Sequence, residues 1–184
     1  MKGKLFFITI CILPFLGISQ EMSISLFQGQ GFGTNIGSEW FRNGPGLQLR
    51  YSKGLNDVDF WSAGVEMRTV NWGNQVAFTS GYQRLYAAVK ENWSFRIGGE
   101  MIHGVVLFRP RSLYALGLKT GHAVRYQSKK RSFFQLDTAI GYNITPGYLD
   151  FGNINQAYEL RLEISYGLLL GRQQKTLDLN YLSL

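Results

Sequence analysis

The 184-residue chain has one cysteine, four prolines and two histidines, and its acidic residues are fewer than its basic ones. A network of disulfides is therefore excluded. No segment beyond residue 19 is apolar for about 18 residues, which excludes a transmembrane helix there. No Walker loop, zinc-spaced cluster or calcium loop is present, so we expect no cofactor and no metal.

Residues 1–19 have the organisation of a secretory signal peptide. A short basic head precedes an apolar run, and the small residues Gly17 and Ser19 predict cleavage before Gln20. The segment holds two lysines, so its removal lowers the formal charge from +7 to +5. A lipid-modified Cys11 is the alternative, but a large residue precedes this cysteine where a small one is expected.

The remaining chain alternates polar and apolar residues, and 15% of the sequence is aromatic. The clearest stretch is 157–168, where leucine, isoleucine and tyrosine alternate with charged and small residues. A period of two is the pattern of a strand with two different faces. We predict strands over 22–34, 45–55, 60–70, 81–91, 93–107, 114–127, 132–143 and 156–170.

The connections between these strands alternate in length. The short ones are predicted over 55–59, 91–93 and 127–131. The longer ones are predicted over 37–44, 71–80, 108–113 and 143–155. With eight strands, all the short connections fall at one end and all the long ones at the other, as in outer-membrane barrels.

The polar faces of the strands carry both charges and glycines. A solvent-facing sheet has no use for so many glycines, whereas the interior of a narrow barrel has to fit large and small residues together. We therefore expect the apolar face to point at lipid and the charged residues to fill the lumen as an ion network with a surplus of positive charge. The predicted network is Arg50, Glu66, Arg68, Arg84, Arg96, Glu100, Lys119, Arg125, Asp137, Glu159, Arg161 and Glu163, with Lys90 on the same face.

In these features the chain resembles the small outer-membrane β-barrels of the OmpX and OmpA transmembrane-domain type. The resemblance is architectural and covers 21–171. It implies an all-β, eight-stranded antiparallel up-and-down transmembrane β-barrel over 20–171, with short periplasmic turns and longer external loops, in the outer membrane of a diderm bacterium. Such barrels usually end on an aromatic residue of the last strand, whereas this chain continues through 172–184.

The 172–184 segment also alternates, so it is either a periplasmic tail or an additional strand. A tail of this pattern could dock on a partner as an added strand. The candidate partner-binding residues are Leu177, Leu179, Tyr181, Leu182 and Leu184.

No group of residues has the spacing of a catalytic site. Glu159 and Glu163 share a face but lie about 13 Å apart along a strand. His103 and His122 are expected opposite Gly117 and Gly98, which would put them about 15 Å apart, too far to share a metal. Both histidines fall on the apolar face. We expect structural or interfacial histidines and no enzyme, with lipid A modification as the enzymatic alternative.

The sequence therefore favours a non-enzymatic envelope protein that acts as a structural or interaction subunit, alone or within a larger outer-membrane complex. Arginine binds phosphate through paired hydrogen bonds. The external-loop residues Arg42, Arg109 and Arg111 are accordingly candidate contacts for lipopolysaccharide. We expect outer-membrane lipid and an envelope protein as partners, and no nucleic acid. The alternatives are a small anion-favouring channel and a soluble periplasmic lipocalin-like ligand-binding barrel.

Overall fold

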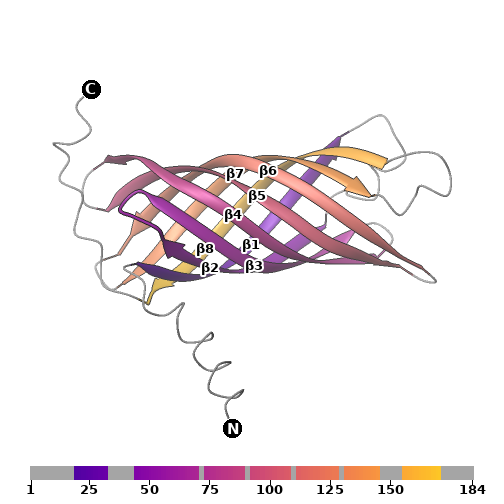
Figure 1. The fold of residues 1–184 in the computed structure, drawn as a ribbon, viewed down its shortest axis with the longest axis horizontal. Coiled ribbons are helices and arrows are strands. Elements are labelled where there is room, and N and C mark those ends of the chain that lie inside the picture. Colours follow the sequence, from indigo (N-terminus) through magenta and orange to yellow (C-terminus); the bar gives the residue numbers. More distant parts are fainter. Residues whose placement is uncertain are drawn as a thin grey trace, which may run out of the picture.

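The computed structural model describes residues 19–32, 44–70, 73–89, 92–108, 111–128, 131–145 and 155–170. These residues form eight strands and no helix (Figure 1). The strands are β1 (Gln20–Phe32), β2 (Pro45–Gly54), β3 (Asp59–Val70), β4 (Gly73–Val89), β5 (Trp93–Phe108), β6 (Arg111–Gln127), β7 (Ser132–Thr145) and β8 (Asn155–Leu169).

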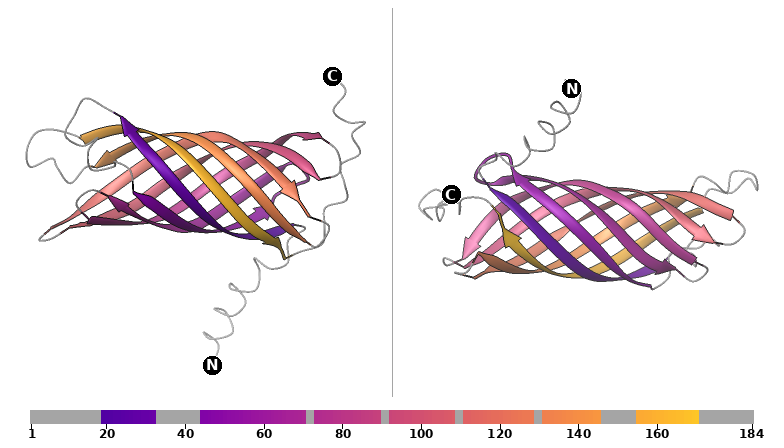
Figure 2. Two further views of the ribbon diagram at one scale, coloured as in Figure 1. Left: turned by 180° about the vertical axis from the view of Figure 1, so that it is seen from behind. Right: turned by 90° about the horizontal axis from the view of Figure 1, so that it is seen from below.

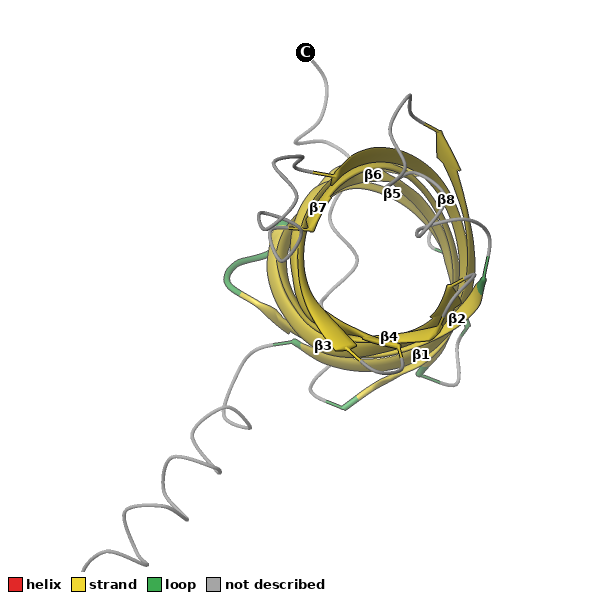
Figure 3. Cartoon of the chain, turned by 90° about the vertical axis from the view of Figure 1, so that its right-hand side faces the viewer, coloured by secondary structure: helices red, strands yellow, loops and turns green. Residues whose placement is uncertain are grey.

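Each strand pairs antiparallel with its neighbours in the sequence, and β1 pairs with β8 to close a barrel. The view along the axis shows one closed ring (Figure 3). The partners of Met22 can be followed around the ring through Tyr51, Ala63, Ser80, Met101, Leu118, Tyr142 and Tyr158. Tyr158 pairs with Phe32, ten residues further along β1 than the start. This stagger gives the strands the tilt that Figure 2 shows and leaves an interior that side chains can fill.

The alternation of the sequence is an alternation of exposure. Along β8, Glu159, Arg161 and Glu163 are buried, whereas Leu160 and Leu162 are exposed. The same holds around the ring, so the apolar residues coat the outside and the polar residues make the core. Because a lipocalin-like barrel requires the opposite arrangement, the structure overturns that alternative.

Strand β4 contains the one irregularity among the described strand pairs, a bulge between Leu85 and Ala87. The bulge adds a residue to β4, so the alternation between inward and outward side chains shifts by one residue at this point. Before the bulge the even-numbered Arg84 is exposed, and after it the odd-numbered Val89 is exposed. The predicted inward position of Arg84 is therefore wrong.

Two of the predicted long loops are not loops. Strands β3 and β4 pair as far as Val70 with Gly73, and β5 and β6 pair as far as Phe108 with Arg111. The residues assigned to loops over 71–80 and 108–113 largely extend these two hairpins. The long connections that remain join β1 to β2 and β7 to β8, and they lie outside the described residues.

At the other end of the barrel the connections are short turns. The side chain of Asn56 accepts hydrogen bonds from the backbone nitrogens of Val58 and Asp59, at 2.9 and 2.8 Å, which fixes the turn between β2 and β3. Arg131 has a φ of 62° before β7, a conformation that few residues other than glycine adopt. No helix in the described part of the chain is long and apolar enough to cross a membrane.

Candidate functional site: a charged lumen

The interior of the barrel is the most organised polar region of the described structure. Its buried side chains are mostly polar, and the large apolar ones among them are few: Phe27, Phe60, Ile102, Val106 and Phe133. Buried charges are tolerable only when they are paired and hydrogen-bonded. The described ion pairs meet that condition in three layers along the axis.

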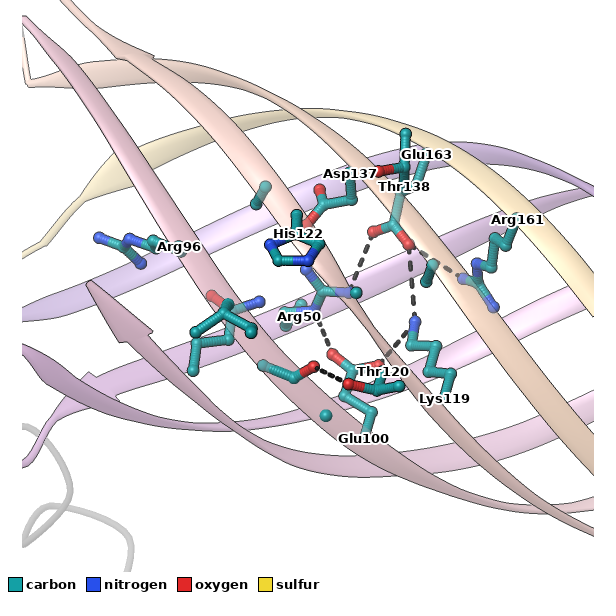
Figure 4. A pocket seen from close by; sticks show the side chains of 17 residues that line it. Arg50, Arg96, Glu100, Lys119, Thr120, His122, Asp137, Thr138, Arg161 and Glu163 are labelled. Atoms are coloured by element: carbon teal, nitrogen blue, oxygen red, sulfur yellow. Dashed lines mark hydrogen bonds and ion pairs between the residues drawn. The ribbon is translucent and has the colours of Figure 1, made fainter. Parts of the chain in front are cut away.

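The middle layer joins four strands (Figure 4). The Arg50 guanidinium on β2 lies 2.9 Å from the Glu100 carboxylate on β5 and 3.0 Å from the Glu163 carboxylate on β8. The Lys119 ammonium on β6 bridges the same two carboxylates at 2.7 and 3.6 Å. Gln48 donates to Thr79 at 3.0 Å and accepts from Arg50 at 2.8 Å. Because each charge has two partners, the layer links opposite walls of the barrel.

The layer nearest the start of β1 is built on Glu21. Its carboxylate accepts from Arg96 at 3.0 and 3.2 Å and from Arg125 at 2.5 Å. The two guanidinium groups also stack on aromatic rings, at 3.9 Å over Phe60 and 3.7 Å over Phe133. A stacked and paired guanidinium keeps its charge while its face is covered by carbon. This layer lies at the end of the lumen where the turns are short.

The layer at the far end combines the same elements. Arg161 lies 2.8 Å from Glu66 and stacks 3.3 Å above the Phe27 ring. Arg68 binds Glu159 through both carboxylate oxygens at 2.8 Å. The Glu159 carboxylate also accepts from Asn143 at 3.0 Å, and Arg68 donates to Gln75 at 2.7 Å.

The described interior charges balance. Six cations face six carboxylates: Arg50, Arg68, Arg96, Lys119, Arg125 and Arg161 against Glu21, Glu66, Glu100, Asp137, Glu159 and Glu163. Asp137 is half-buried and accepts from Gln135 at 2.8 and 3.0 Å. Among the described residues the expected surplus of positive charge is not found, because Arg84 lies outside and Glu21 lies inside, whereas Lys90 lies outside the described residues.

Arg84 is the one predicted network residue that the structure places on the outer wall. Its side chain is 60% exposed, and its guanidinium lies 3.7 Å from Asp59. Asp59 also accepts a hydrogen bond from Tyr82 and one from Asn56. The other eleven predicted network residues face the lumen.

Glu21 is the interior acid that the sequence did not identify. The predicted first strand begins one residue later, so Glu21 fell between the expected cleavage site and the expected strand. Glu21 is odd-numbered like Ser23 and Ser25 of β1, which are both buried, so the alternation along the strand could have placed it in the lumen.

The histidines lie on the outer wall, as the sequence indicates, but one residue out of the expected register. His103 pairs with Leu116, and His122 pairs with Ile97. His103 Nδ1 lies 3.2 Å from the Tyr114 hydroxyl, so its partner is an aromatic residue of the next strand.

Two groups of predicted site residues are not placed. Arg42, Arg109 and the whole 172–184 segment, with Leu177, Leu179, Tyr181, Leu182 and Leu184, lie outside the described residues. Arg111 begins β6, but its side chain is outside the described part as well.

The described lumen offers little room for a ligand. A cavity of about 40 Å³ is lined by Asp137 and by the small residues Gly98, Gly121, Ala123 and Ala139. Figure 4 shows Asp137 and the charged side chains around this cavity. That volume suits a water molecule. No group of three or more potential metal ligands occurs among the described residues.

Comparison with known proteins gives the fold. No protein-family model and no curated protein matches the chain. Among solved structures, Neisserial surface protein A has a TM-score of 0.54 at 9% identity, covering 81% of this chain and 96% of its own. The N-terminal β-barrel domain of Pseudomonas aeruginosa OprF has a TM-score of 0.48 at 8% identity, with 80% and 97% covered. The chain thus has the fold of the eight-stranded outer-membrane β-barrels, which confirms the predicted fold class and its resemblance to the OmpX and OmpA type.

Proposed function

We propose that this protein is a non-enzymatic outer-membrane barrel with a closed lumen, which anchors its loops and tail in the cell envelope as a structural or interaction subunit. The observation that carries the proposal is the charge-balanced lumen. Among the described residues, ion pairs between six cations and five of the six interior carboxylates tie the walls together at three levels.

The outer wall supports residence in a bilayer. It exposes large apolar residues on every strand, with Leu26 68% exposed and Ile164 59% exposed. A monomer in water rarely exposes an apolar patch of more than a few hundred Å². Here the apolar surface encircles the molecule, which is the arrangement that suits hydrocarbon.

Aromatic residues supply the two edges of this belt. Trp93 packs on Tyr126 with ring centroids 5.1 Å apart, and Phe134 packs on Tyr166 at the same distance, near the short turns. Near the other end, Tyr142 packs on Tyr158 at 5.1 Å. Tyr158 and Tyr166 are eight residues apart on a tilted strand, which corresponds to about 20 Å along the axis. Aromatic girdles at about that separation are typical of outer-membrane barrels.

The lumen argues against conduction. An ion entering the middle layer has to separate Arg50 from two carboxylates, Glu100 and Glu163, which themselves hold Lys119. Breaking one partner from a buried pair costs about 3–5 kcal/mol. The balance among the described interior charges gives no support to an anion preference.

The proposed contacts lie at the ends of the barrel. Arg42, Arg109 and Arg111 would face outward beyond the belt, where the phosphates of lipopolysaccharide lie, and the 172–184 segment would face the periplasm. The support is chemical: guanidinium binds phosphate in pairs of hydrogen bonds, and an alternating segment can add to a sheet edge.

Membrane fractionation and gel mobility test the proposed location. We expect the protein in the outer-membrane fraction, with a mobility that shifts on boiling, because a folded barrel resists detergent until heated. Recovery in the aqueous fraction after osmotic shock would overturn the proposal.

Planar bilayers and affinity capture test the role. Purified protein should give no conductance steps, and regular single-channel steps would replace the proposal with a channel. Capture from detergent-solubilised envelopes should recover partner proteins with the full chain and should lose them when residues 172–184 are deleted. In a separate variant, replacement of Arg42, Arg109 and Arg111 by glutamine should weaken lipopolysaccharide binding. Recovery of a lone monomer with both variants unchanged would contradict a subunit role.

A further inference from the structure

A stripe of polar side chains from β1, β7 and β6 lies on the lipid-facing wall, and Leu160 and Leu162 of β8 separate its β1 residues from the others. We call it the outer polar stripe and define it as Gln28, Gln30, Thr120, His122 and Thr138. All five residues are exposed. They come from three strands, and the register of the barrel brings them together.

The strand register gives the stripe its shape. Successive cross-strand partners form one row of Gln30, Leu160, Ile140 and Thr120, and an adjoining row of Gln28, Leu162, Thr138 and His122. The residues of both rows, with Gly121, Ala139 and Arg161 of the intervening wall, line a groove. Small residues in its floor let another surface approach the barrel closely.

The rows on either side of the stripe are apolar. On one side the partners are Tyr158, Tyr142, Leu118 and Met101, and on the other side they are Leu26, Ile164, Leu136, Val124 and Phe95. The stripe therefore lies between the aromatic edges of the belt, at a depth where neighbouring lipid offers only hydrocarbon.

Hydrocarbon cannot hydrogen-bond an amide or a hydroxyl. Within the described part of the chain, the Gln30 amide and the Thr138 hydroxyl make no side-chain hydrogen bond, and the His122 ring lies nearly perpendicular to the Tyr86 ring with centroids 6.1 Å apart. Thr120 donates to the Gly98 carbonyl at 3.1 Å. Exposed polar groups in lipid carry a free-energy cost that a polar partner surface removes.

We propose that the outer polar stripe is the contact face of a twofold dimer of this chain in the membrane. The proposal rests on the proposed outer-membrane location. Each stripe residue is uncharged or can be neutral, and each can both donate and accept a hydrogen bond. A surface of that chemistry is complementary to itself, which an interface between two identical faces requires.

Cysteine cross-linking in vesicles tests the contact. Ile140, within the stripe on β7, is 56% exposed, and Met67, across the barrel on β3, is 55% exposed. We expect Ile140→Cys to give a disulfide-linked dimer under mild oxidation at low protein density in lipid, and Met67→Cys to give none. The protein without an introduced cysteine serves as the blank.

Energy transfer between labelled copies measures the role of the polar groups. Gln30→Leu combined with Thr138→Val should weaken self-association about fiftyfold, since a membrane hydrogen bond contributes roughly 0.6 kcal/mol and each of the two residues occurs twice at a twofold interface. Val65→Leu, on the opposite wall, should leave self-association unchanged.

Three results would overturn the dimer. The first is equal cross-linking of Ile140→Cys and Met67→Cys, and the second is energy transfer that shows only monomers at every protein density. The third is that Ile140→Cys cross-links in cells only to a different protein. Each of these leaves a boiling-dependent gel shift and membrane fractionation intact. Loss of those two properties would instead contradict the outer-membrane location.

Discussion

Glu21 and Arg125 lie 104 residues apart in the sequence, and inside the barrel the carboxylate Oε1 accepts from the guanidinium Nη1 at 2.5 Å. The same carboxylate holds Arg96 from a third strand. One acid at the start of the first strand is thus the shared partner of two arginines, which β5 and β6 bring to the same end of the lumen.

Replacement of Glu21 by glutamine is therefore expected to destabilise the barrel strongly. It leaves Arg96 and Arg125 close together without their shared counter-charge, and an uncompensated buried charge costs about 3–5 kcal/mol. Equilibrium urea unfolding in lipid vesicles measures the change. The double variant Glu21→Gln with Arg96→Gln should be less affected than Glu21→Gln alone, and equal losses would contradict the pairing.

Arg84 and Arg96 provide a contrast between the two faces of the wall. Arg84→Gln removes an exposed guanidinium 3.7 Å from Asp59, and such surface pairs contribute about 0–1 kcal/mol. Arg96→Gln removes a buried and stacked one and should cost several-fold more free energy of unfolding. If the two variants unfold at the same urea concentration, the placement of Arg84 outside the lumen is wrong.

Two buried glycines test how tightly the lumen is packed. A Cβ atom on Gly64 would lie 2.5 Å from the Leu49 carbonyl oxygen, whereas one on Gly141 would meet nothing closer than 3.6 Å. Gly64→Ala should therefore cost about 1–3 kcal/mol of unfolding free energy, and Gly141→Ala should be tolerated. The urea midpoints of the two variants measure the difference. A lower midpoint for Gly141→Ala than for Gly64→Ala would argue against this strand register.

The sidedness of the wall can be probed at Leu26. An arginine at this exposed position, midway along the apolar belt, should cost about 2–4 kcal/mol in vesicles, because it carries charge to the bilayer midplane. Leu55→Arg, at a turn residue that is 59% exposed, should be nearly neutral. Similar stabilities for the two variants would show that Leu26 does not face hydrocarbon.

The alternation of the sequence was sufficient to predict the strand number, the closed barrel and eleven of the network residues, because a period of two records which face each residue takes. Parity alone could not locate Arg84, since the bulge between Leu85 and Ala87 reverses the faces within β4. It also could not choose partners: Glu21 meets Arg96 and Arg125 through the stagger of the ring, which no local pattern records.

The ends of the hairpins were predicted less well for a related reason. The residues of 73–80 include glycine, asparagine and serine, which favour loops locally, yet they pair along β3 and β5 as regular strand. The pairing depends on neighbours distant in the sequence, and these override the local preference of the residues.

The seam between β1 and β8 sets the order of events during assembly. These strands share twelve backbone pairings, running from Glu21 with Leu169 to Phe32 with Tyr158. Until the last strand has been synthesised and exported, the first strand carries an unsatisfied row of amides that could pair with another molecule. Contacts of such long sequence separation form slowly. The barrel can therefore close only after β8 has followed the other strands to the membrane.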